Sequence, residues 1–406
     1  MGANLSRTNL NTAALILVAV SICGIHFSNA VSSISLFLAL SISFLIILKE
    51  KRVKLSWLWL IGVFAAYQVG MEYFVHSANS SELVKKTLVK APLIFAPLLF
   101  LISDKPKLSE KLLTVVSLFI SWTAIASIMV YFKDKEFYDI MISESKPLPL
   151  FSKVYHIEYS LILSISCLGT VYHGMKNRSR FIGHAQLALA IILILALHIL
   201  STRTGLLGFY TGGFAFFLFY FNRTTLKTKV FSFVAIVALV LILYQVPSLK
   251  NRITNSKEDL MSVVNGETVN NKSFGQRWVA WGASIESIKK RPLTGYGMSH
   301  VKSTIDKNYR PEHESKIDSK NKVMPHNVYL ETMVQSGVLA GLLYFLFLVI
   351  GIVHSLSKNR VLLASILCAL LAASMFESIT ERQAGIIALI GFISLAKSSK
   401  TVEQKG

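Results

Sequence analysis

The stretch PHNVYLETMVQSG (325–337) places polar side chains directly before a long apolar run. If Pro325 lies in the first turn of a helix, His326 and Tyr329 follow on one helix face. A histidine can take up or release a proton near neutral pH, although a lone histidine at such a boundary also suits a plain amphipathic anchor. We expect the polar neighbours to cap this helix and to orient an acceptor: Asn327, Tyr329 and Glu331.

Two arginines lie within or beside apolar runs, where burying a charge is energetically unfavourable. Arg203 lies in STRTGLLG (201–208), a tight junction between two apolar runs, and Arg277 lies in SFGQRWVAW (273–281). A charge near the middle of a bilayer costs a few kcal/mol, so each arginine either extends toward lipid headgroups or binds an anion. The guanidinium group offers paired donors that match two phosphate oxygens. The two arginines therefore predict a phosphate site, with simple headgroup contact as the alternative.

Two lysines reach into another apolar run. Lys86 and Lys90 are four residues apart and share a helix face, where like charges repel. A bound anion is one partner that relieves this repulsion. The alternative is that both side chains extend to the interface with Glu82 as their counter-ion.

A short charged turn, ESITERQAG (377–385), joins the last two apolar runs. An internal ion pair of Glu381 with Arg382 is the simplest account of it. Glu377 and Arg382 are also candidates for orienting an acceptor.

Arginines, lysines and a histidine at one membrane face suit an anionic lipid headgroup, with chemistry at its phosphate. The sequence contains no HExxH, no DxD and no Cys/His pairs at metal-ligand spacing. Its three cysteines lie in apolar runs and form neither a disulfide framework nor a metal cluster. We therefore expect fixed cationic side chains, no metal and no other cofactor.

The elements that position these residues must be membrane helices. The chain is 53% hydrophobic and 16% charged, whereas soluble proteins carry roughly a quarter charged residues. Uncharged runs such as 112–132 approach the ~20 residues that cross a bilayer core. We expect an all-α fold, a polytopic transmembrane bundle of about twelve spans, near 12–27, 30–48, 56–74, 84–103, 112–132, 157–174, 184–200, 205–222, 230–247, 336–356, 361–376 and 384–397.

The basic residues indicate the orientation. The net charge of +20 collects in short loops on one side of these spans, as the positive-inside rule requires of cytoplasmic loops, so we expect no nucleic-acid partner. Both termini then lie in the cytoplasm. The predicted domains are 1–247 with nine spans, 248–335 as one large periplasmic loop, and 336–406 with three spans and a cytoplasmic tail.

The large loop contains an amphipathic helix. In 275–290, helical spacing aligns four apolar side chains that could rest on the membrane interface, and RPLTGYGM (291–298) then forms a turn-rich break. The four are Trp278, Trp281, Ile285 and Ile288.

At these residues the chain resembles the O-antigen ligase superfamily of membrane glycosyltransferases, which also holds O-antigen polymerases and protein O-oligosaccharyltransferases. The resemblance covers the order of spans, the single large loop after the ninth span, and three motifs: STRTGLLG (201–208), GQRWVAWGASIESIKKRPLTGYG (275–297) and PHNVYLETMVQSGVLAGLL (325–343). The HN-x-YLE-x(5)-G form before a span is the most specific of these.

The resemblance implies metal-independent, inverting transfer of a glycan from undecaprenyl diphosphate to an acceptor hydroxyl. Arg203 and Arg277 match the family's diphosphate-holding arginines, and His326 matches the histidine proposed to activate or orient the acceptor. Lys86 and Lys90 match no family motif, and their contact with the diphosphate is our own inference. The implied location is the bacterial inner membrane with a periplasmic active site.

Several functions remain open from sequence. The leading one is an O-antigen ligase that uses a lipid A-core acceptor. A polymerase that extends a carrier-linked glycan and a protein O-oligosaccharyltransferase share its chemistry. A transporter or flippase needs polar residues at mid-membrane on several spans, and a non-catalytic assembly partner does not need the arginine and histidine set.

Overall fold

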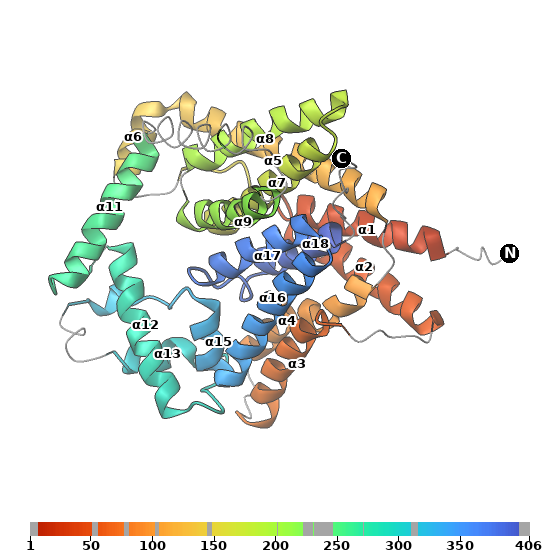
Figure 1. Ribbon diagram of the computed structural model, residues 1–406. Coiled ribbons are helices and arrows are strands. Elements are labelled where there is room, and N and C mark those ends of the chain that lie inside the picture. Colours follow the sequence, from red (N-terminus) through yellow and green to blue (C-terminus); the bar gives the residue numbers. More distant parts are fainter. Residues whose placement is uncertain are drawn as a thin grey trace.

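The computed structural model describes residues 7–50, 56–76, 81–101, 105–143, 148–200, 202–221, 230, 247–270, 272–309 and 316–397. Within these ranges every regular element is a helix, so the predicted all-α fold is confirmed (Figure 1). The N-terminal helices are α1 (Arg7–Gly24), α2 (Asn29–Glu50), α3 (Trp59–Phe74), α4 (Ser81–Leu101), α5 (Pro106–Lys133), α6 (Lys135–Ser143), α7 (His156–Lys176), α8 (Phe181–Leu200) and α9 (Arg203–Phe221).

The C-terminal helices fall into two groups. The polar stretch before residue 336 forms α11 (Pro247–Val264), α12 (Ser273–Lys290), α13 (Val301–Lys307), the 3-10 turn η1 (Ser319–Asn321) and α15 (Val328–Ser336). Apolar helices follow: α16 (Val338–Ser357), α17 (Val361–Ser374) and α18 (Gln383–Ala396).

Each predicted span that the structure describes coincides with a helix, to within a few residues at its ends. The predicted span 230–247 lies outside the described residues except at its two ends. Helix α6 was not predicted. Among the described residues five helices are long and apolar enough to cross a membrane, namely α1, α2, α5, α8 and α16, and α17 and α18 are shorter apolar helices.

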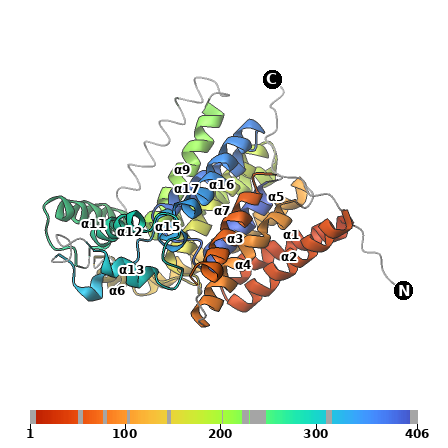
Figure 2. The ribbon, with the colours of Figure 1, turned by 90° about the horizontal axis from the view of Figure 1, so that it is seen from below.

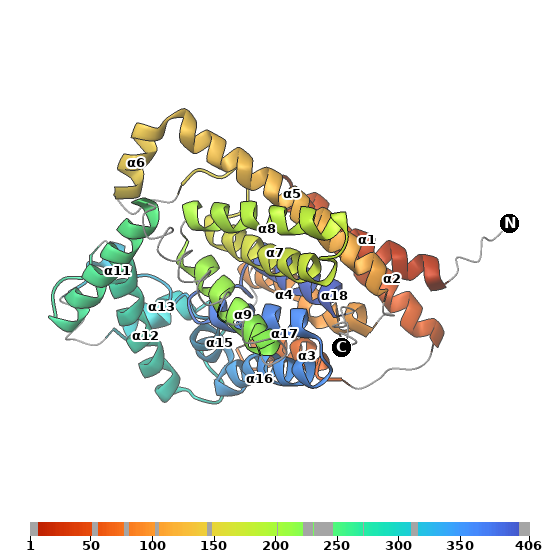
Figure 3. The same ribbon diagram turned by 45° about the horizontal axis from the view of Figure 1, so that its top comes forward.

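The apolar helices surround α18, nearly all of whose residues are buried. Helices α1, α4, α5, α7 and α17 all contact it, and Figure 3 shows α5, α7 and α8 passing over the bundle on one side. Large apolar side chains on the outer surface remain exposed, including Phe37, Phe74 and Phe181. An outer surface of this kind suits a lipid environment.

The polar stretch forms a separate layer beside one end of the bundle (Figure 2). It has a small apolar core of its own, which includes Val279, Val301, Ile305 and Val334. Within this layer, the buried face of α12 carries small residues such as Ala280 and Ala283. Trp278 and Ile285, on the other side of the helix, are exposed. The amphipathic helix of the sequence thus occurs, with half of its predicted apolar face turned outward.

A glycine-rich turn joins this layer to the bundle. Tyr296 N and Gly297 N donate hydrogen bonds of 2.9 and 2.8 Å to the carbonyls of Val334 and Gln335 at the end of α15. Gly337, between α15 and α16, has φ of 84°, and a Cβ atom there would lie 2.2 Å from Leu293 O. Only glycine fits this junction, which fixes the direction in which α16 leaves the layer.

Candidate functional site

Several of the predicted site residues meet at the connection between α17 and α18. Four of its side chains each contact a different part of the fold: Glu377, Ser378, Glu381 and Arg382. A turn held in this way is well suited to positioning groups from several helices, because neighbouring residues of the connection cannot move independently.

His326 lies in the segment that enters α15. Its Nδ1 atom is 3.1 Å from Glu377 Oε1, and its side chain is a quarter exposed. The backbone of His326 has φ of 47°, in the left-handed region that is uncommon for a residue other than glycine. The Trp281 ring nitrogen donates a 2.6 Å hydrogen bond to Pro325 O and so fixes the chain just before it. A strained backbone that its surroundings hold in place is typical of functional positions.

Helix α15 begins later than the sequence predicted. Its first residue is Val328, and the Asn327 side chain caps it by accepting a 3.0 Å hydrogen bond from Leu330 N. Pro325 is therefore not in the first turn, and His326 does not share the helix face of Tyr329. Asparagine is among the most favourable N-cap residues, so the helix begins after Asn327 and not at Pro325.

Arg277 joins the same carboxylate from the other side. Its Nη2 atom lies 3.6 Å from Glu377 Oε2, and its Nη1 donates a 2.8 Å hydrogen bond to Phe376 O. Burial raises the pKa of Glu377, but the hydrogen bond with His326 and the charges of Arg277 and Arg382 outweigh burial and leave its pKa below the ordinary value. Glu377 is thus an anion that connects His326, the predicted base, with Arg277, a residue predicted to bind phosphate.

Arg203 and Arg277 line one small cavity. It has a volume of about 230 Å³, and its other lining residues are Leu207, Ser256, Phe274 and Phe376. Burial lowers the pKa of Arg277, Glu377 opposes that shift, and the positive charge of Arg203 adds to it. Two cations that repel across a cavity favour an anion between them.

The position of Arg203 follows from the packing of α9. A Cβ atom on Gly205 would lie 2.5 Å from Ser160 Cβ, so the glycine allows α9 to approach α7 closely. Arg203 then stands at the first turn of α9, with Nη1 3.8 Å from Asp259 Oδ2 of α11. Its buried Nε has no hydrogen-bond partner among the described residues. The arginine therefore keeps donor capacity that a ligand could use.

The lysines lie outside this cavity. Lys90, only 1% exposed, is 2.6 Å from Glu381 Oε1 and donates to the side-chain oxygens of Gln68 and Gln335 at 3.0 Å. Lys86 donates to Met298 O at 2.6 Å. The predicted contact of both lysines with the diphosphate therefore lacks geometric support: neither lines the cavity of the arginines. Glu381 supplies a counter-charge for Lys90 within the protein.

The expected pair of Glu381 with Arg382 is not formed. Glu381 binds Lys90, and Arg382 Nη1 donates to Glu158 Oε1 of α7 at 3.0 Å. The Arg382 guanidinium also lies 4.6 Å from the ring centre of Tyr155. Adjacent side chains in a turn diverge, so each reaches a different helix more easily than it reaches the other.

The two remaining predicted residues face into the fold. Glu331 is buried and accepts a hydrogen bond from the Ser378 hydroxyl. Burial, reinforced by the nearby Glu381, raises the pKa of Glu331 to about 8. Tyr329 donates to Leu371 O at 3.2 Å. Glu331 holds α15 against the connection, Tyr329 holds it against α17, and neither lines the arginine cavity.

Sequence reasoning missed the buried partners of these charges. Glu158, Asp259, Gln68 and Gln335 lie far from their partners along the chain, and each pairs across two elements. Glu158 in the apolar run 157–174 was the available clue, because an acid there requires a counter-charge. Within the described part of the chain no group of three His, Cys, Asp or Glu side chains forms a metal site.

No curated protein matches the chain. A family model described as O-Antigen ligase matches residues 188–345. The matched segment contains Arg203, Arg277 and His326 but ends before Glu377. Together with the apolar helices, this match indicates a membrane protein, and it supports the resemblance of the chain to the O-antigen ligase superfamily.

Proposed function

We propose that the protein is an O-antigen ligase, a glycosyltransferase that moves a glycan from undecaprenyl diphosphate to a hydroxyl of a lipid A-core acceptor. One observation carries the proposal. Arg203 and Arg277 line a single cavity, and Glu377 connects Arg277 to His326. A phosphate site and a base are thus joined through one carboxylate.

The cavity suits the leaving group. When the bond between the anomeric carbon and the diphosphate oxygen breaks, the electron pair remains on that oxygen, and negative charge grows on the lipid diphosphate. Arginines already in place stabilise this charge more in the transition state than in the ground state. The Nε of Arg203 has no hydrogen-bond partner among the described residues, and Arg277 adds a second guanidinium charge at the same cavity.

His326 suits the acceptor. With Nδ1 directed at Glu377, the proton on Nδ1 satisfies the carboxylate and leaves Nε2 to accept the acceptor hydroxyl proton. The acceptor oxygen then forms the new bond to the anomeric carbon from the face opposite the diphosphate, and the configuration inverts. Glu377 stabilises the imidazolium that results and holds the ring in place.

The proposed setting follows the charge pattern of the sequence. The protein lies in the bacterial inner membrane with both termini in the cytoplasm, and the site faces the periplasm. Its partners are the carrier-linked donor, the acceptor and the bilayer. It needs neither a metal nor another cofactor, since the side-chain cations take the role that a divalent ion has in other phosphate chemistry.

The second candidate is a polymerase or a protein O-oligosaccharyltransferase of the same superfamily, because the same cavity and base serve any acceptor hydroxyl. A flippase or transporter is less well supported, since these charged pairs gather around the connection between α17 and α18.

Expression in a ligase-deficient strain tests the proposal. A lipopolysaccharide gel that regains its ladder supports a ligase. Glycan that stays on the carrier with altered length contradicts the ligase and favours a polymerase, and glycan on Ser or Thr of proteins favours an oligosaccharyltransferase. Purified protein that makes no product from carrier-linked glycan with any of these acceptors would exclude the enzyme.

A further inference from the structure

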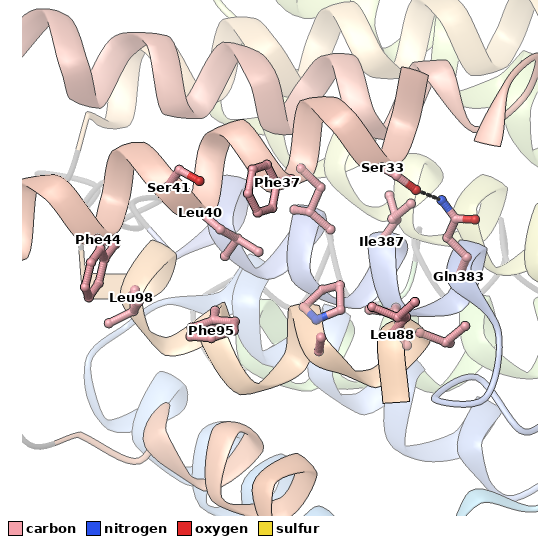
Figure 4. Close-up of a pocket in the computed structure, with 15 residues that line it drawn as sticks. Ser33, Phe37, Leu40, Ser41, Phe44, Leu88, Phe95, Leu98, Gln383 and Ile387 are labelled. Atoms are coloured by element: carbon pink, nitrogen blue, oxygen red, sulfur yellow. Dashed lines mark hydrogen bonds between the residues drawn. The ribbon is translucent and has the colours of Figure 1, made fainter. Parts of the chain in front are cut away.

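A second cavity lies away from the arginines, in a groove between α2, α4 and α18. Its volume is about 590 Å³. Figure 4 shows α2 and α4 as its two walls, with Phe37 and Phe44 on one and Leu88 and Phe95 on the other. These side chains are exposed, whereas Ile386 on the floor is buried.

The groove is continuous along the helices. On α2 the lining residues begin at Ser33 and recur to Phe44 with spacings of three and four, so they form one stripe. At 1.5 Å per residue this stripe is about 16 Å long. A bilayer core is about 30 Å thick, so the groove has the depth of one leaflet. This length fits a hydrocarbon chain that hangs from a headgroup at one membrane face.

The upper end of the groove is polar and lies near the site. The Gln383 side chain closes it by hydrogen bonds to Ser33 Oγ and Asn29 O. Lys85, exposed and one helical turn before Leu88, stands above the opening on the same side of α4. A cation there complements an anionic headgroup. An extended chain spans at most about 3.6 Å per residue, so Gln383 lies within about 20 Å of Glu377.

The groove and the arginine cavity flank the connection between α17 and α18. The cavity is lined from α9, α11, α12 and Phe376, the groove is lined from α2, α4 and α18, and no residue lines both. A donor whose diphosphate lies between Arg203 and Arg277 therefore reaches the connection from the Glu377 side. The groove reaches it from the Gln383 side, where a second lipid fits.

We propose that this groove binds an acyl chain of the acceptor, so that the acceptor is an anionic, acylated glycolipid presented to His326 from the side opposite the donor. This inference rests on the proposed function and places the lipid part of its acceptor. A protein-modifying enzyme of the same fold, whose acceptor carries no acyl chain, has no use for such a groove.

Two acceptors test the proposal. One is acylated lipid A-core, and the other is the same core oligosaccharide after complete deacylation. Each is offered with undecaprenyl-diphosphate-linked glycan to the wild type and to Ala91→Trp, which fills the groove from α4. Ser41→Trp fills it from α2 and serves as a second variant if the first fails to accumulate. Val115→Trp, on the exposed surface of α5, is the matched control.

The wild type and Val115→Trp should use the acylated acceptor at least tenfold more efficiently than the deacylated one. The groove variants should lose this preference and keep the rate on the deacylated acceptor. The proposal is overturned if the groove variants retain the preference, or if their rates fall equally with both acceptors, since an equal fall places the donor chain in the groove.

A binding measurement separates failure of the groove from failure of the function. Lipid A with a photoreactive diazirine in one acyl chain should crosslink to α2 and α4 in the wild type and not in Ala91→Trp, whether or not transfer occurs. Crosslinking with no transfer to either acceptor would support lipid binding in the groove and refute the proposed function. Equal crosslinking by photoreactive phosphatidylglycerol, or labelling of the groove by photoreactive undecaprenyl diphosphate instead, refutes the acceptor assignment.

Discussion

Glu377 Oε1 lies 3.1 Å from His326 Nδ1, while the other oxygen of the same carboxylate lies 3.6 Å from Arg277. The residue is 1% exposed. One buried anion therefore couples the proposed base with a proposed diphosphate ligand, and the consequences can be measured.

The arginines should act on turnover more than on folding. Arg277→Ala is expected to lower transfer by about 10²- to 10³-fold, as loss of one preorganised donor does at other sites, while its abundance in the membrane stays near that of the wild type. Glycan transfer by purified protein and immunoblots of membranes measure the two effects. Arg291→Ala, an exposed arginine directly after the last residue of α12, is the control and should behave as the wild type. Full activity of Arg277→Ala would remove it from the site.

Glu377 and His326 should behave as one unit. Glu377→Gln keeps the shape of the side chain but removes the charge that holds the imidazolium, so we expect kcat to fall while KM for the donor changes little. The double variant Glu377→Gln/His326→Ala should be no slower than His326→Ala, because groups that act together are not additive. Glu286→Gln on α12 is the control. Additive losses in this cycle would show that the two residues act separately.

Lys90 should support the fold rather than the diphosphate. Lys90→Met leaves Glu381 without its partner, and breaking a buried pair costs about 3–5 kcal/mol, so the variant should accumulate poorly. Lys90→Met/Glu381→Gln removes both charges and should recover abundance in membrane immunoblots. If Lys90→Met accumulates normally and loses only donor binding, the lysine belongs to the phosphate site after all.

Stability should fall as the pH rises toward 8, and Glu331 should be a cause. Its pKa is raised to about 8 in the folded protein from an ordinary value of 4.5. Between these values the folded state holds a proton that the unfolded state releases, so the free energy of unfolding decreases with pH. Thermal denaturation in detergent from pH 5 to 8.5 should show a flatter dependence for Glu331→Gln than for the wild type. The same slope in both proteins would contradict the raised pKa.

Transfer should continue in EDTA. The cations proposed to bind the diphosphate are arginine side chains, which a chelator does not remove. Rates of purified protein before and after dialysis against EDTA measure this, with added Mg²⁺ as the reverse experiment. A loss of activity that Mg²⁺ restores would contradict the proposed metal-independent chemistry.

The sequence by itself determined most of the apolar helices and predicted the candidate residues of the site. Apolar runs and N-capping are local, since helix hydrogen bonds join residues four apart, so 184–200 and 205–222 were recognisable as α8 and α9. The three motifs likewise singled out Arg203, Arg277 and His326 from residue type and setting alone.

Only the tertiary structure decided how the charges pair. Glu381 and Arg382 are neighbours in sequence, yet one meets Lys90 of α4 and the other meets Glu158 of α7. The groove between α2, α4 and α18 is likewise invisible in any one helix. Such partners depend on how distant helices pack, and packing is fixed by the shapes of whole surfaces rather than by a local period. A charge in an apolar core needs a partner, but the packing of the whole bundle determines which residue that partner is.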